Sequence, residues 1–379
     1  MSIEEIGTVR APTGRERRIM IAVVAIGAAI ALPFVDRFFG LGIGLKLIPI
    51  AIFLILALGL NVVVGFAGLL DLGYAAFFAI GAYTAAFLTS PSSWLLQALG
   101  AAPVDFWLAM VMSTAVAAAF GVLLGAPTLR LRGDYLAIVT LGFGEIVPLV
   151  IRNTPEVTRG VQGMNPIGTP TIPGVRFGFE IEPWYYLALA ILILSVILTA
   201  RLRDSRIGRA WAAIREDEVA AASMGVNPVT TKLFAFAMGA SFSGFAGSIW
   251  AAYLQTIDPG QFDFSVSIFV LVMIILGGMG NIYGVIVGGL IVGGFDRMLA
   301  DLISDTLKGI GNAFDIDLLR EADVSRSRSM ILGVALVTMM LVRPEGLFPS
   351  ARRRMELHAA EESAEEAAAQ REMLIETRR

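Results

Sequence analysis

The sequence contains no cysteine and only one histidine, His358, which lies in a polar C-terminal tail. Without thiolates, disulfide bonds, thiolate metal sites and thiol redox chemistry are excluded. The position of His358 also excludes a histidine metal centre or general base from the apolar part of the chain. None of the lysines, Lys46, Lys232 and Lys308, is followed by serine or threonine. A P-loop requires that pair, so we expect no ATPase site and no enzyme in this chain.

Charge is also scarce. Charged residues make up 16% of the chain and hydrophobic residues 56%, and the mean hydropathy is +0.75. A soluble domain carries about 25% charged residues. The net charge of −3 is too small to indicate nucleic-acid binding. Composition alone therefore predicts a membrane protein.

The apolar residues form runs long enough, or nearly so, to cross a bilayer, which takes about 20 residues. These runs are 18–35, 46–64, 67–89, 105–128, 134–151, 184–200, 231–254, 264–279, 281–300 and 329–343. The first resembles a signal peptide, but Pro33 to Asp36 follow in place of a small-residue cleavage site, which favours a retained helix. We predict an all-α polytopic membrane protein with about ten transmembrane helices, some of them broken or short.

Basic residues in the short connections predict the orientation, since they accumulate on the cytoplasmic side. With ten spans, four clusters fall on one side: Arg10 to Arg18, Arg130 and Arg132, Arg201 to Lys232, and Arg343 to Arg354. Both termini are therefore predicted to be cytoplasmic. The expected organisation is an N-terminal tail (1–17), a transmembrane domain (18–347) and a charged C-terminal tail (348–379).

The 40 glycines gather inside apolar runs. Small residues let membrane helices pack closely, which is one explanation. The other is a broken helix that borders a cavity, because irregular backbone at membrane depth is tolerated there. The second explanation is strongest at Val64–Asp71 (VGFAGLLD) and Leu276–Asn281 (LGGMGN), where paired glycines and a polar residue separate two apolar runs.

Two polar residues inside predicted spans are candidates for a pathway across the membrane. Glu145 either contributes to the pathway or extends toward the outer interface. Asn61 either bonds a neighbouring helix or borders the pathway. The full set of candidate pathway residues is Asn61, Gly65, Gly68, Thr140, Glu145, Gly277 and Gly278.

A charged segment, residues 201–232, interrupts the apolar runs. Within it, Ile207, Ala210, Trp211 and Ile214 have helical spacing, and Gly225 ends the pattern. A membrane-surface helix is one interpretation, but such helices usually have a basic polar face, and this one carries the acidic run 216–218. We favour a cytoplasmic helix over residues 205–227 that docks on a soluble partner.

Four long motifs carry a family resemblance. They are GLNVVVGFAGLLDLGYAAFFAIGAYTAA (59–86), LRLRGDYLAIVTLGFGEIV (129–147), IGRAWAAIREDEVAAASMGVNP (207–228) and LGGMGNIYGVIVG (276–288), followed by RPEGL (343–347). In this order they resemble the M-type permease subunit of bacterial high-affinity branched-chain amino acid ABC importers. The likeness extends from about residue 45 to 350.

The resemblance implies a permease in the bacterial inner membrane that moves leucine, isoleucine or valine. Its partners would be a second, H-type permease, two ATP-binding subunits that hold ATP and magnesium, and an extracytoplasmic binding protein. The chain itself would bind no cofactor. The 205–227 helix would then fit a cleft on an ATPase. The residues assigned to this coupling are Ile207, Gly208, Arg209, Trp211, Ile214, Arg215, Glu216, Glu218 and Gly225.

Two departures from the family pattern lie in predicted outer segments. The TGGxxG pattern reads Thr158-Arg159-Gly160-Val161-Gln162-Gly163 here, and Thr158, Arg159 and Gly160 are the candidate contacts to the binding protein. The stretch 301–328 resembles an insertion, and we expect an acidic outer loop that either adjusts binding-protein docking or is a spacer.

Three other functions stay open at this point. Relatives in the same superfamily import sugars, urea or amides. An ion-coupled secondary carrier would need no ATPase but more buried charge than the sequence offers. A membrane scaffold would explain the docking segment but not the glycine-interrupted spans.

Overall fold

The computed structural model describes residues 14–39, 42–128, 134–175, 177–178, 180–314, 324, 327–343 and 345–348. Over these residues the chain is helical, and its only β pairing is two isolated bridges, Met164 with Ile257 and Ile172 with Val175. The all-α prediction is confirmed. Most of the two predicted tails, 1–17 and 348–379, lies outside the described residues.

Each predicted span overlaps a helix, although the third, 67–89, begins seven residues before α3. The main helices are α1 (Gly14–Phe39), α2 (Ile43–Leu60), α3 (Tyr74–Thr89), α5 (Phe106–Thr128), α6 (Asp134–Asn153), α8 (Ile181–Asp204), α11 (Pro228–Leu254), α12 (Phe264–Gly277), α13 (Ile282–Gly294) and α16 (Arg328–Val342). Among the described residues, 7 helical stretches are long and apolar enough to cross a membrane. Because α1, α3 and α16 are not among these seven stretches, the count of ten crossings stays a prediction.

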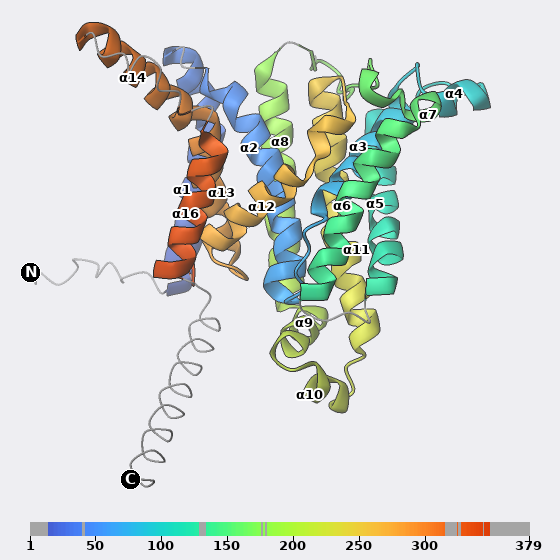
Figure 1. The fold of residues 1–379 in the computed structure, drawn as a ribbon. Coiled ribbons are helices and arrows are strands. Elements are labelled where there is room, and N and C mark those ends of the chain that lie inside the picture. Colours follow the sequence, from blue (N-terminus) through green and yellow to red (C-terminus); the bar gives the residue numbers. More distant parts are fainter. Residues whose placement is uncertain are drawn as a thin grey trace, which may run out of the picture.

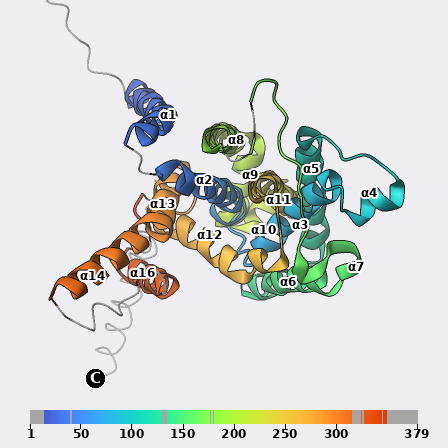
Figure 2. The same ribbon diagram turned by 90° about the horizontal axis from the view of Figure 1, so that it is seen from above.

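The helices run side by side as an elongated bundle (Figure 1). The start of α1 and the end of α16 lie toward the end of the bundle that carries α9 (Arg206–Glu216) and α10 (Glu218–Ser223). The short helices α4 (Trp94–Leu99) and α7 (Pro155–Thr158) lie at the opposite end. Seen along the bundle, α11 is near the middle, whereas α1 stands at the edge (Figure 2).

Close packing around α11 explains one group of glycines. A Cβ on Gly244 would lie 2.6 Å from the Thr114 Cα of α5, and one on Gly247 would lie 2.6 Å from the Ala82 nitrogen of α3. The backbones of α3, α5 and α11 therefore touch directly, as small residues permit in membrane bundles. The Tyr74 hydroxyl also donates a hydrogen bond to the Gly239 carbonyl, 2.8 Å away. For these glycines the packing explanation holds.

Helix interruptions are present at both places where a broken helix was one of the two explanations. After Leu60, α2 continues as a π-helix, η1 (Asn61–Phe66), and residues 67–73 are irregular before α3 begins. The other break separates Gly277, the last residue of α12, from Ile282, the first of α13. Gly278 has φ +115°, a backbone conformation that residues with a side chain rarely adopt. A mid-helix π segment often marks a functional position.

Two predicted elements have a different form. Residues 301–314 are not a loop, because α13 continues through the π-helix η4 (Phe295–Leu299) into α14 (Ala300–Phe314). An acidic composition hid this helix, although its apolar residues recur with helical spacing. The predicted helix over 205–227 is two helices, α9 and α10. Asp217 separates them because its side chain caps α10, accepting from the Val219 and Ala220 amides at 2.8 and 3.0 Å.

Candidate functional site

A cavity of about 1710 Å³ lies between α1, α2, η1, α8, α9 and the start of α13. Its walls are mostly aliphatic, with Leu54, Leu192 and Ile286 among them. Charged residues, Arg203, Asp204, Arg209, Arg215 and Glu216, line it where α8 passes into α9. Such a volume exceeds the usual range for a small-molecule pocket, about 300–1,000 Å³. Among the described residues, no group of three or more acidic or histidine side chains could hold a metal ion.

The two helix breaks meet beside this cavity. The Asn61 Oδ1 accepts a hydrogen bond of 2.9 Å from the Gly280 amide, which joins η1 to the α12–α13 break. A Cβ on Gly65 would lie 2.7 Å from the same amide nitrogen. Gly65 and Gly280 both line the cavity, while Asn61 is fully buried behind them. Asn61 is thus hydrogen-bonded to the α12–α13 break at the cavity wall.

The other candidate pathway residues are divided between different places. The Gly68 Cα faces the Arg215 side chain, and Gly277 and Gly278 pack against Gly284 and Phe348. None of these three lines the cavity.

The two candidates on α6 are also apart from the cavity. The Thr140 hydroxyl accepts from the Leu72 amide at 3.0 Å and donates to the Ala137 carbonyl at 3.1 Å. Glu145 is exposed on the outer face of α6. It makes no hydrogen bond or ion pair within the described part of the chain.

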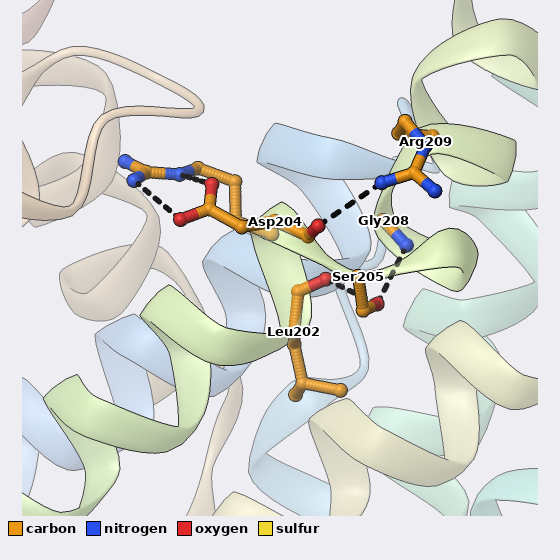
Figure 3. Close-up of polar contacts among 6 residues, drawn as sticks. Leu202, Asp204, Ser205, Gly208 and Arg209 are labelled. Atoms are coloured by element: carbon orange, nitrogen blue, oxygen red, sulfur yellow. Dashed lines mark hydrogen bonds and ion pairs between the residues drawn. The ribbon is translucent and has the colours of Figure 1, made fainter.

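The turn from α8 into α9 is fixed by local polar contacts (Figure 3). The Ser205 Oγ accepts from the Gly208 amide at 3.2 Å and donates to the Leu202 carbonyl at 2.7 Å. The Arg209 Nη1 donates to the Asp204 carbonyl at 3.1 Å. Serine is a preferred N-cap because its oxygen satisfies a free amide of the first helical turn. The direction of α9 is therefore set by the sequence around Ser205.

The α9–α10 segment (residues 206–223) is attached firmly to the start of α11. Trp211 is fully buried, stacks on Phe234 with ring centroids 6.0 Å apart, and donates from Nε1 to the Thr231 carbonyl at 2.8 Å. The Lys232 Nζ forms an ion pair with the Glu218 Oε1 at 2.7 Å, and the lysine side chain is 8% exposed. The segment and α11 thus form one packed unit.

These contacts divide the predicted coupling residues. Gly208, Trp211 and Ile214 are buried against their own chain, and Glu218 is held by Lys232. Ile207, Arg209, Glu216 and Gly225 are exposed. Val219 and Met224 were missed, although they are 63% and 86% exposed. Their irregular spacing obscured them, because they follow the break at Asp217 and no longer continue the α9 pattern.

At the opposite end of the bundle, the candidate binding-protein contacts form a compact turn. Thr158 is buried, and its Oγ1 accepts from the Gly160 amide at 3.2 Å. Arg159 is exposed and has φ +62°, a left-handed conformation that is natural for the glycine of the family pattern. Nearby, Met164 and Ile257 exchange backbone hydrogen bonds of 2.9 and 3.2 Å. The turn is thereby linked to the segment that follows α11.

The comparison with known proteins agrees with this architecture. Residues 44–310 match the family described as the permease component of branched-chain amino acid transport systems. The chain belongs to this family. It is 39% identical over 338 residues to the high-affinity branched-chain amino acid transport system permease protein LivM of Escherichia coli, with 83% of this chain and 72% of that protein covered. The LivM of Salmonella typhimurium has the same identity and coverage.

More distant family members are also similar. The probable permease LivM of Methanocaldococcus jannaschii is 25% identical over 337 residues, covering 81% of this chain and 93% of that protein. The permease LivH of Escherichia coli is 22% identical over 272 residues, covering 68% and 84%. No solved structure matches the chain. The family is thus established at the level of a membrane transport component.

Proposed function

We propose that this chain is the M-type permease subunit of an ABC importer that moves leucine, isoleucine or valine across the bacterial inner membrane. The observation that carries the proposal is the 39% identity to LivM over 83% of the chain. The aliphatic cavity beside two helix breaks supports it, because an apolar wall suits substrates with apolar side chains. ATP and magnesium belong to the partner ATPases in this proposal, and the chain itself binds no cofactor.

The proposal includes ten crossings with both termini in the cytoplasm. The shared side of the α1 start, the α16 end and the α9–α10 segment supports it (Figure 1). The basic residues Arg201, Arg203, Arg206 and Arg209 near that end agree with the rule that cytoplasmic connections are rich in arginine. The turn at Thr158, Arg159 and Gly160 then faces outward, toward a binding protein.

Within this arrangement an ATPase docks on the exposed part of the α9–α10 segment. Val219 in this segment and Met224, one residue beyond it, have largely exposed apolar side chains, as helix-in-groove recognition requires. Replacing Met224 by Glu should weaken ATPase association without loss of stability, because the side chain is 86% exposed. The matched control is Arg201→Ala, an exposed change on α8 outside the segment. Equal ATPase retention by the two variants would argue against docking at Met224.

A second permease subunit is proposed to cover α6. Tyr135, Ile138, Glu145, Ile146 and Leu149 follow one another at helical spacing and are exposed. A carboxylate within a span is costly against lipid, and such groups usually face protein or water. Gly142 on the same face has nothing within 4 Å of its Cβ position, which leaves room for a second helix. The similarity to LivH as well as LivM agrees with a paired permease.

The decisive experiment is leucine uptake into proteoliposomes that contain this chain, a LivH-type permease, two ATPases and a binding protein, with and without internal ATP. ATP-dependent uptake that leucine, isoleucine and valine compete for supports the proposal. Competition by urea, amides or sugars instead would assign another substrate class. Uptake by this chain alone under an ion gradient would establish a secondary carrier and refute the importer.

A further inference from the structure

The Gly65 carbonyl, at the end of η1, has an unusual hydrogen-bond partner. In an intact helix, the Gly65 carbonyl would accept from an amide about four residues later. Here the chain leaves the helix, and the Ala67 and Leu69 amides bond to Val62 and Val63 instead. The Arg215 Nη1, from α9, donates to the Gly65 carbonyl. A residue 150 positions away thus caps a broken membrane helix.

Three features show that the chain is shaped around this arginine. A Cβ on Gly68 would lie 2.8 Å from the Arg215 Cγ, so only glycine admits the side chain there. A Cβ on Gly280, in the second break, would lie 3.5 Å from the Arg215 Nη1. The guanidinium therefore lies against both breaks. A cation is also favourable at a helix C-terminus, where the carbonyl dipoles converge.

The two breaks are in turn connected to each other by the Asn61–Gly280 hydrogen bond. A continuous path of contacts therefore runs from the α9–α10 segment, through Arg215, to the η1 end, and through Asn61 to the α12–α13 break. Arg215, Gly65 and Gly280 all line the cavity. If the α9–α10 segment shifts while Arg215 still caps η1, this wall of the cavity must move with it.

We propose that Arg215 is a positioning residue that links the α9–α10 segment to the two helix breaks at the cavity wall. The inference rests on the proposed function, in which that segment receives the ATPase movement. When Arg215 caps η1, the breaks are held together and that wall is closed. When the segment moves away, the Gly65 carbonyl loses its donor, and the breaks separate.

The first test uses the complete complex in proteoliposomes and compares Arg215→Ala, Arg215→Lys and the control Arg201→Ala, an exposed arginine of α8 outside the segment. Arg215→Ala should reduce the number of leucine molecules moved per ATP hydrolysed by about fivefold or more, the usual size of coupling between sites. The leucine concentration at half-maximal uptake should stay unchanged, because Arg215 positions the wall and does not select the substrate. Arg215→Lys should restore part of the lost leucine transport per ATP, since lysine retains a charged hydrogen-bond donor.

A second test does not depend on transport. Because the chain has no cysteine, Val287→Cys places a single thiol on the cavity wall of α13. Its labelling by a water-soluble maleimide should rise about tenfold when Arg215→Ala is added, because a charged hydrogen bond no longer holds the breaks. Arg201→Ala should leave the labelling rate unchanged. The thermal midpoint of each variant, measured alongside, identifies a variant that has simply unfolded.

The outcomes separate the two proposals. If wild-type complex shows no ATP-dependent uptake, the proposed function is wrong, and the labelling result still decides the role of Arg215 as a cap. If wild-type uptake is normal and Arg215→Ala changes the uptake-to-ATP ratio and the labelling rate less than twofold, the inference about Arg215 is refuted. A folded Arg215→Lys that behaves as Arg215→Ala would show that the cap needs the guanidinium.

Discussion

The two sides of the bundle are built differently. Around α11, the backbones of α3 and α5 approach so closely that Gly81, Gly244 and Gly247 have no room for a methyl group. Beside the cavity, α1 contacts α8 through the Tyr185 and Tyr186 hydroxyls, which donate to the Ala29 and Ile30 carbonyls, and the Cβ position of Gly27 has nothing within 4 Å. Glycine thus brings α3, α5 and α11 together on one side, whereas at Gly27 on α1 it makes no such contact. The difference indicates a rigid half that carries the α9–α10 segment and a looser half that borders the cavity.

The largest expected effect on stability comes from forcing apart the closely packed helices around α11. Gly244→Val should destabilise the solubilised protein by about 3 kcal/mol or more, because overpacking costs about 1–3 kcal/mol even where side chains can yield. Here the obstacle is the Thr114 backbone, which cannot yield without moving α5.

The matched control is Gly27→Val on α1, where the space is open. It should change stability by less than about 0.5 kcal/mol, as surface changes usually do. Denaturation midpoints in detergent compare the two variants. Equal losses would mean that the two sides are packed alike.

A smaller effect is expected where the rigid half is joined to the α9–α10 segment. Lys232→Ala should cost about 2–3 kcal/mol, because it removes the lysine that pairs with the partly buried Glu218 carboxylate. The value is below the full cost of breaking a buried pair, since the Glu218 side chain is 28% exposed. The double variant Lys232→Ala/Glu218→Ala should regain part of the loss. Additive losses in this double-mutant cycle would contradict a specific pair.

The next effect concerns the indole hydrogen bond of the same junction. Trp211→Phe retains an aromatic ring against Phe234 but removes the donor to the Thr231 carbonyl. A loss of about 1–2 kcal/mol is expected from the missing hydrogen bond and the smaller ring. Trp250→Phe offers a comparison, because its indole donates to the Gln261 side chain in the rigid half, 3.0 Å away. Thermal unfolding of both variants measures the difference.

The smallest effect on stability is expected in the looser half. Val196→Phe adds volume at the cavity wall, where space is available, and should alter stability by less than about 0.5 kcal/mol. Maximal leucine uptake by the assembled complex should nevertheless fall, because the added ring occupies the proposed pathway. A large loss of stability with unchanged uptake would show that Val196 packs in a closed core.

The sequence predicted the helices well because their signal is local. Runs of about 20 apolar residues and the glycine pairs at Gly277 and Gly65 can be recognised without a partner. The prediction was wrong where the helical spacing of apolar residues and an acidic composition pointed to different structures. Residues 301–314 carry acidic residues that suggested a loop, yet they form α14. Asp217 was grouped with an acidic run, although its capping side chain divides α9 from α10.

The site was less predictable because its contacts join distant residues. Nothing near Arg215 in the sequence indicates Gly65 as its partner, and polarity alone placed Thr140 and Glu145 with Asn61, although they lie on another side of the bundle. Trp211 and Ile214 have the spacing of a docking face, but that face is buried against α11. Periodicity shows which residues share a face, and it does not show whether the face is turned toward a partner or toward the protein itself.

The length of α11 gives the rigid half one further property. Its 27 residues span about 40 Å, from Lys232 beside the α9–α10 segment to the Gln255–Ile257 stretch that is hydrogen-bonded to the turn near Met164. It is packed through glycines along its length and held by contacts at both ends. A tilt of about 5° would displace one end by about 3.5 Å relative to the other. A tilt of α11 would therefore move the junction at Lys232 and the turn near Met164 together.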